Sequence, residues 1–187
     1  MIIVFLANGF EEIEALTPLD LLRRAGKEIL TVSITNERAV TGAHGITVLV
    51  DLTKDELTHV CDEMLILPGG MPGTKNLDAS PLTDRLIEEV LENGGRLAAI
   101  CAAPMVLGKR GLLEGKRATC YPGFEEYLTG ATVGGKVIRD GRIITAAGMG
   151  VAQEFGLEII SALFISAIRN YHPANLYFLG QHVTLYR

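Results

Sequence analysis

Short runs of apolar residues recur along the chain and alternate with segments of helical periodicity. The runs at 2–6, 29–34, 64–67 and 97–100 have the length and the Val, Ile and Leu content of strands buried on both faces. The segments between them carry apolar residues at helical spacing. This alternation predicts an α/β fold, and residues 1–169 form one unit because no linker or internal repeat interrupts the pattern.

The first long helix is predicted over residues 11–25, ended by Gly26. Pro18 inside it should kink the helix or mark its true start. Glu14 lies beside the apolar stripe. Taken alone, it is interpreted as a solvated carboxylate in the first turn, where acidic residues are favoured. The stripe expected to form the buried face consists of four residues: Ile13, Leu16, Leu19 and Leu22.

Later segments predict further short elements. Two short strands at 39–40 and 46–50 flank a glycine-containing turn, in which His44 alone is best interpreted as a loop residue. Ser80 and Pro81 begin a helix, 137–144 forms a hairpin around Asp-Gly, and a long helix ends near 169. The tail, 170–187, lacks a period; its segment 175–180 is close to a common protease-site linker, natural or engineered, and receives no function.

Cys101 follows the apolar run at 97–100 and precedes Pro104, which is favoured in the first turn of a helix. This places the thiol at a strand-to-helix turn, beside small residues. A helix N-terminus favours thiolate, so we expect a depressed pKa and a reactive sulfur. The alternative is a buried core cysteine.

Two other segments end strands and could face the same cleft. The loop at 68–73 contains Gly69 and Gly70, and its backbone N–H groups can bind an anion or oxyanion. It lacks the Lys and Ser/Thr of a phosphate-binding loop. Cys120 and Tyr121 follow another short predicted strand.

Composition narrows the class of protein. The chain has 187 residues, 48% of them hydrophobic, and a net charge of −5, which disfavours a nucleic-acid partner. Three cysteines at 61, 101 and 120 have no metal-ligand spacing and indicate a reducing compartment rather than a disulfide framework. No apolar run reaches transmembrane length, and no signal peptide is evident. We therefore expect a cytoplasmic protein without metal, cofactor or membrane partner.

Taken together, five motifs resemble the ThiJ/PfpI superfamily, in particular its branch of protein deglycases associated with Parkinson disease. Arg23-Arg24-Ala25-Gly26 also resembles that branch, and the likeness covers nearly the whole chain except the tail. Any one motif alone is unspecific. The matching stretches are Gly9 to Glu14, Leu67 to Gly70, Ala98 to Pro104, Thr119 to Pro122 and Gly148 to Gly150.

The resemblance implies a flavodoxin-like fold, with helices on both faces of a mostly parallel sheet, and a homodimer. It makes Cys101 a nucleophile on a strained elbow and Glu14 a buried acid bonded to its sulfur. Backbone N–H groups of Gly70 and Ala102, in the loop with Gly69, would hold an oxyanion. His44 would reach the neighbouring subunit's site, and Arg24 would lie in the dimer-packing helix. Many members carry a histidine where this chain has Tyr121, so a Cys–His pair is not secured; His44 from the partner is a possible substitute.

Two functions follow from this reading. The first is a cofactor-free enzyme acting on reactive aldehydes or their adducts, like a glutathione-independent glyoxalase that converts methylglyoxal to lactate, or like a deglycase. The second is an oxidative-stress sensor or chaperone in which Cys101 is oxidised. Peptidase or amidotransferase activity, known in more distant relatives, would need a histidine beside the cysteine.

Overall fold

The computed structural model describes residues 1–58 and 60–169, which form a sandwich around one six-stranded sheet. All neighbouring strands are parallel except the last pair, which forms an antiparallel hairpin. The α/β fold with a mostly parallel sheet is thereby confirmed. In spatial order the strands are β2 (Ile29–Ser33), β1 (Ile2–Leu6), β5 (Met64–Leu67), β6 (Arg96–Ile100), β10 (Ile143–Ala146) and β9 (Val137–Asp140).

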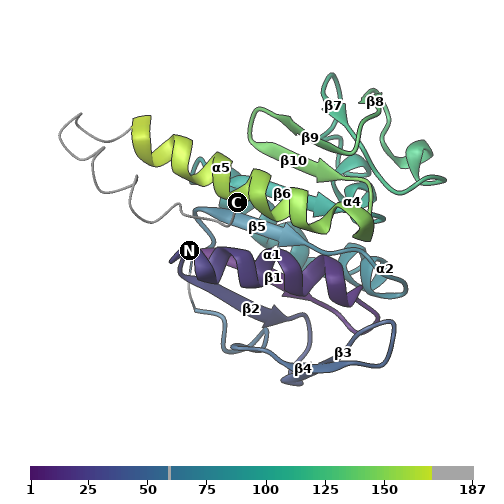
Figure 1. The fold of residues 1–187 in the computed structure, drawn as a ribbon. Coiled ribbons are helices and arrows are strands. Elements are labelled where there is room, and N and C mark those ends of the chain that lie inside the picture. The colour runs from purple at the N-terminus through teal and green to yellow at the C-terminus, as the bar shows by residue number, and fades with distance from the viewer. Residues whose placement is uncertain (59, 170–187) are drawn as a thin grey trace.

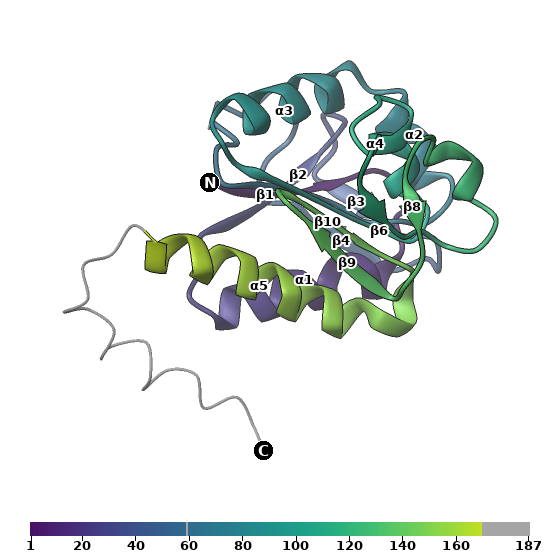
Figure 2. The ribbon, with the colours of Figure 1, turned by 90° about the horizontal axis from the view of Figure 1, so that it is seen from above.

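Helices cover both faces of the sheet (Figures 1 and 2). The long helices α1 (Glu12–Arg24) and α5 (Ala152–Arg169) lie together on one face. On the other face lie α2 (Gly73–Asp78), α3 (Pro81–Glu92) and α4 (Pro104–Gly108). Alternate residues of each central strand enter two separate cores, which is why those strands are apolar throughout.

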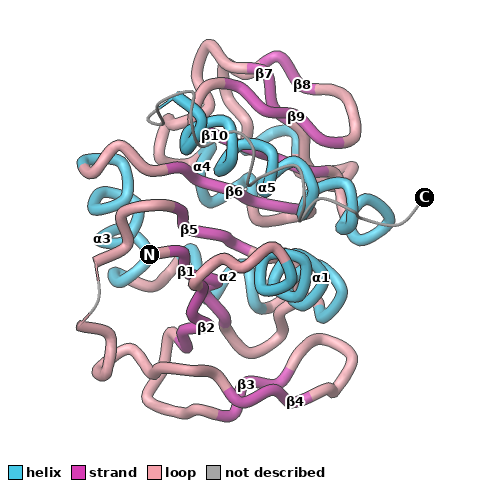
Figure 3. The backbone as a smooth tube through the Cα atoms, turned by 60° about the vertical axis from the view of Figure 1, so that its left-hand side comes forward, coloured by secondary structure: helices cyan, strands magenta, loops and turns pink. Residues whose placement is uncertain are grey.

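Two small sheets extend the ends of the central sheet (Figure 3). Strands β3 (Ala39–Thr41) and β4 (Thr47–Leu49) form a hairpin near β2, and β7 (Arg117–Ala118) pairs with β8 (Thr132–Val133) near β9. Two 3₁₀ turns, η1 (Glu125–Tyr127) and η2 (Met149–Val151), complete the elements. Among the described residues, no helix is both long and apolar enough to cross a membrane. The predicted tail lies outside the described residues.

Two details of the first helix differ from the prediction. Helix α1 begins at Glu12 and continues through Pro18, so the proline is not its start. Ile13 is 46% exposed, whereas the expected buried face included it. The residues of α1 that join the core against the sheet are Ala15, Leu19 and Leu22, and Ile13 lies about 200° around the helix from Ala15. Helix α2 was not predicted, because its six residues are too few to show a period.

Candidate active site

Cys101 lies on a strained turn between β6 and α4. Its φ is 63°, and it is the only non-glycine residue with positive φ in residues 1–58 and 60–169. The Cys101 N–H donates to the carbonyl of Ala146 at 2.8 Å, and its carbonyl accepts from the Tyr121 N–H at 2.8 Å. Bonds from two other segments thus fix a backbone conformation that is unfavourable for a residue with a side chain.

The Cys101 sulfur is partly buried among hydrogen-bonding groups. Backbone N–H groups of Gly70 and Ala102 donate to it, and the side chain of Glu14 shares a hydrogen bond with it. Gly70 follows β5 and Ala102 opens the turn into α4. Two N–H donors aimed at one point can hold an oxygen atom that becomes negative during a reaction there.

Glu14 reaches this point from the first turn of α1 and is only 1% exposed. The Gly69 N–H donates to its Oε2 at 3.1 Å, and the Met149 N–H also bonds its carboxyl group. The carboxylate of Glu11, the N-cap of α1, accepts the backbone N–H of Glu14 at 2.7 Å. Gly69 therefore contacts the carboxyl group and not the sulfur. Glu14 is not the solvated helix-start residue that its local sequence suggests.

The carboxyl group of Glu14 disfavours ionisation of the Cys101 thiol, whereas the hydrogen bond from the thiol favours the carboxylate form of Glu14. Burial raises the pKa of Glu14 to about 7, and the carboxylate of Glu11 adds to that shift. Burial also raises the pKa of Cys101 to about 12, together with the charge and the hydrogen bond of Glu14. The expectation of a depressed thiol pKa is therefore wrong. The two N–H donors act in the predicted direction, but desolvation and the adjacent carboxylate outweigh them.

Glycines at positions 69 and 70 allow the loop after β5 to pack closely against the Cys101 elbow and the start of α1. A Cβ atom on Gly69 would lie 2.4 Å from Oε2 of Glu14 and 2.6 Å from Cβ of Cys101. Gly70 has a φ of +93°, and a Cβ there would lie 2.3 Å from the backbone nitrogen of Glu11. A side chain at either position would separate the acid from the thiol.

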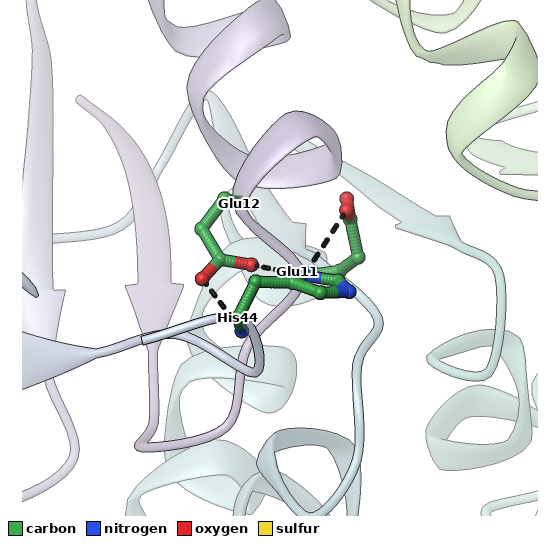
Figure 4. Close-up of side chains that lie close together, drawn as sticks. All are labelled: Glu11, Glu12 and His44. Carbon is green, nitrogen blue, oxygen red and sulfur yellow. Dashed lines mark hydrogen bonds and ion pairs between the residues drawn. The ribbon is translucent and has the colours of Figure 1, made fainter. Parts of the chain in front are cut away.

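A second charged group lies at the start of α1 (Figure 4). Nδ1 of His44 is 2.8 Å from Oε2 of Glu12 and 4.0 Å from Oε1 of Glu11. The pKa of His44 is raised by its bond to Glu12. Burial opposes the charge on Glu12, but bonds from His44 and from backbone N–H groups keep the pKa of Glu12 below its usual value. Within its own chain, His44 therefore pairs with Glu12 and not with Cys101.

The described residues contain one grouping whose ligand atoms lie close enough for a metal ion, and it is this trio of Glu11, Glu12 and His44. All three of its members already have partners, because Nδ1 of His44 pairs with Glu12. Oε1 of Glu12 accepts the backbone N–H of His44 at 2.8 Å. Oε2 of Glu11 accepts the backbone N–H of Glu14 and so caps α1. We interpret the trio as an ion pair that attaches the β3–β4 turn to α1.

Of the remaining predicted residues, Tyr121 lies at the site, Cys120 precedes it in the chain, and Arg24 lies far along α1. Tyr121 lies at the site: Cδ2 of its ring and Oε1 of Glu14 are 3.2 and 3.8 Å from the position that a Cβ on Gly148 would occupy. Cys120 is buried, which together with the charge of Glu125 raises the pKa of its thiol to about 11. Arg24 lies at the opposite end of α1, where its Nε is 2.7 Å from Asp20. Glu11 and Met149 also bond or shift the Glu14 carboxyl group, although no role at the site was predicted for either; both lie in motifs that resemble the family.

The fold and the site define a class of flavodoxin-like α/β proteins that carry a cysteine on a strained elbow at the carboxyl edge of the sheet, beside a buried carboxyl group. A model of the DJ-1/PfpI family matches residues 1–162. The chain belongs to this family, as its motifs indicated.

Several curated relatives have similar sequences. The chain is 36% identical over 164 residues to protein dj-1beta of Drosophila melanogaster, with 86% of the chain and 88% of the relative covered. A protein from Pyrococcus abyssi named a deglycase is 31% identical over 149 residues, with 78% of the chain and 88% of the relative covered. Protein DJ-1 homolog B of Arabidopsis thaliana is 35% identical over 165 residues, covering 87% of the chain. The chain spans only 38% of the length of that plant protein.

Solved structures show the same fold. A DJ-1 superfamily protein from Salmonella typhimurium matches with a TM-score of 0.82 at 31% identity. The match covers 92% of this chain and 98% of the Salmonella chain. Drosophila melanogaster DJ-1beta matches with a TM-score of 0.80 at 34% identity, covering 87% and 89%. The sheet order and helix layers described above are therefore those of the family.

Proposed function

We propose that this protein is a cysteine-dependent, cofactor-free enzyme that acts on reactive aldehydes or their adducts. One observation carries the proposal: a thiol, a carboxyl group with a pKa of about 7 and two convergent N–H donors meet around Cys101. These groups supply the nucleophile, the acid/base and the oxyanion site that addition to a carbonyl group requires. The deglycase name of the Pyrococcus abyssi relative agrees with this class of substrate.

The first step follows from the pKa order of the pair. Near neutral pH, Glu14 loses its proton before Cys101 does, so its carboxylate can accept the S–H proton as the sulfur attacks. The new C–S bond forms at the aldehyde carbon, and the carbonyl electron pair moves to its oxygen. The N–H groups of Gly70 and Ala102 hold that oxygen. Reprotonation of the oxygen gives a hemithioacetal.

Glu14 then moves a proton between adjacent carbon atoms. With methylglyoxal, it removes the proton from the sulfur-bearing carbon and returns one to the former ketone carbon. The aldehyde carbon is thereby oxidised and the ketone carbon reduced, so no external oxidant is needed. Water cleaves the resulting thioester, which releases lactate and restores the thiol. A deglycase reaction would proceed through the same hemithioacetal, formed from an adduct on an amine or thiol.

A second candidate function uses the same donors. Of the three cysteines, Cys101 is half-buried, whereas Cys61 and Cys120 are buried. Two equivalents of hydrogen peroxide would convert its thiol to a sulfinic acid with release of two waters. Gly70 and Ala102 would then bind a sulfinate oxygen, and the protein would report oxidative stress. We expect the protein to be a homodimer in the cytoplasm in either role.

Lactate formation from methylglyoxal tests the proposal. We expect wild-type protein to form lactate without added cofactor and Cys101→Ser to lose that activity. Cys120→Ser is the matched control, because it changes a neighbouring buried thiol and should keep most of the activity. Glu14→Gln and Glu14→Leu should each reduce kcat/KM by about 10²-fold or more, the usual contribution of a general acid/base. Absence of turnover in the wild type, with peroxide oxidation confined to Cys101, would favour the sensor.

A further inference from the structure

A cleft of about 670 Å³ lies at the carboxyl ends of β1 and β2. Asn8 and Thr35, which follow these strands, line it together with Asn76 of α2 and Ser80, the residue before α3. Helices α2 and α3 cover the face of the sheet opposite α1 (Figure 2). Ligands bind in crevices at this edge of open α/β sheets. None of the described residues that line the cleft bonds the thiol or the carboxyl group of the candidate active site, so the two places are separate.

The lining of the cleft carries a positive charge. Lys54 is the one charged residue among the described residues that line it, and within the described part of the chain its ammonium group has no ion pair. The acidic residues nearest to the lining in the sequence are engaged elsewhere. The carboxylate of Asp55 accepts a hydrogen bond from Asn36 at 2.6 Å, and Asp78 forms ion pairs with two basic residues that follow α4. Lys54 can therefore attract an anion into the cleft.

Uncharged donors and apolar side chains complete the lining. The Ser80 hydroxyl makes no capping bond to α3. The side-chain oxygen of Asn8 accepts the Thr41 N–H at 2.9 Å, which leaves the amide NH₂ of Asn8 without a partner among the described residues. Ile34 and Leu82 are half-buried and pack on the core, so their positions are fixed. Apolar surface with a few polar groups is typical of sites that bind small organic molecules.

We propose that this cleft binds an organic phosphate monoester of about the size of a mononucleotide, with its phosphate at Lys54 and its organic group on Ile34 and Leu82. A lysine suits phosphate, whereas a carboxylate is recognised best by the planar fork of an arginine, and no arginine is among the described residues that line the cleft. The volume of the cleft lies within the range of about 300–1,000 Å³ that is usual for small-molecule sites. The inference is independent of the proposed function, because it needs no chemistry at Cys101.

Titrations followed by ¹H–¹⁵N NMR spectroscopy at constant ionic strength test the proposal. Adenosine 5′-monophosphate (AMP) and phenyl phosphate should each cause saturable shifts of the amide signals of Thr35, Lys54 and Leu82. Adenosine, benzoate and inorganic phosphate should each bind about tenfold or more weakly, because each lacks either the phosphate or the organic group. If neither phosphate ester shifts these signals, the proposal is wrong. Equal affinity for inorganic phosphate and the two esters would overturn the assignment of an organic ligand.

Variants locate the binding within the cleft. Lys54→Gln should weaken AMP binding by about tenfold, because it removes a charge-assisted contact with the phosphate. Leu82→Ser should weaken it by about threefold to tenfold through lost apolar contact. Lys136→Gln is the matched control, because it removes the same charge from an exposed lysine before β9, at the other end of the sheet, and should leave the affinity unchanged. Cys101→Ser should bind AMP as the wild type does. Equal weakening by Lys54→Gln and Lys136→Gln would show attraction by net charge alone and refute the site.

Discussion

Glu14 is the residue whose properties differ most from its local sequence. It lies in a polar, acidic stretch, yet it is buried, and its carboxyl group bonds residues from three other segments. Its pKa rises to about 7 because burial disfavours the charged form. Only the resemblance to a known family predicted this burial. Helical spacing alone could not, because the contacts come from the loops after β5, β6 and β10.

The raised pKa of Glu14 makes stability depend on pH. In the unfolded chain the group ionises near its ordinary value of 4.5, whereas in the folded chain it keeps its proton to about 7. The folded state therefore loses stability as pH rises between these values, and Glu14→Gln removes that loss. Urea denaturation should show the variant gaining about 1–3 kcal/mol relative to wild type between pH 4.5 and pH 8. A constant difference across this range would contradict burial of an ionisable acid.

The thiol of Cys101 should respond to the same substitution. Glu14→Gln removes the adjacent negative charge, so the pKa of Cys101 should fall by about one unit or more from its raised value. Absorbance at the thiolate band during a pH titration measures it. Cys61, whose pKa burial raises to about 12, serves as an internal control that should not change.

Cys101 should also be the first of the three thiols to be oxidised. It is partly exposed and carries two N–H donors on its sulfur, whereas Cys61 and Cys120 are buried. Mass spectrometry after mild peroxide treatment should locate the added oxygen atoms there. Earlier oxidation at either buried thiol would show that accessibility does not control the reaction.

At the scale of elements, the β6–α4 elbow stores backbone strain. A residue with a side chain at a φ of 63° is destabilised by about 1–2 kcal/mol relative to glycine. Cys101→Gly should therefore unfold at a higher urea concentration than Cys101→Ala, with a difference of about 1 kcal/mol. Ala99→Gly in the middle of β6 is the control, and it should lower stability. Equal stability of the two Cys101 variants would mean that the elbow relaxes once the sulfur is absent.

The sequence predicted the central elements better than the connections. Runs of Val, Ile and Leu identified the buried strands β1, β2, β5 and β6, since a strand covered on both faces is apolar at every position. Ile13 shows the limit of this approach. An apolar residue on a helix need not be buried, and only the packing of α1 on the sheet decides which side of the helix is covered.

At the scale of the whole molecule, the site exists because parallel strands end at one edge. Segments after β5, β6 and β10 and the start of α1 contribute to it, and they span residues 11 to 149. The sequence predicted Gly70 from a glycine-rich loop at a strand end, because ligands bind at that edge of an open sheet. It predicted Cys101 from its position between another strand end and Pro104. The partners of Glu14 depended on the strand order, which local patterns do not contain.

The exposed side chains near the start of α1 favour assembly of two copies through that helix. Ile13 is 46% exposed on α1, and Ile46 is 55% exposed, with its N–H 3.4 Å from Oε1 of Glu12 on the same helix. Both residues are exposed apolar side chains on segments that Glu12 joins, and burial of exposed apolar side chains stabilises association. Light scattering at micromolar concentration should give twice the mass of the chain.

Ile13→Asp tests whether this part of the surface is in the interface. A charge placed there should weaken the dimer by about tenfold or more, because it must be desolvated on association. Val133→Asp is the matched control, since Val133 is exposed on β8, near the opposite end of the sheet (Figure 3). Far-ultraviolet circular dichroism should be unchanged in both variants. If Val133→Asp dissociated the dimer and Ile13→Asp did not, the interface would lie at β7–β8, and α1 would be free for another partner.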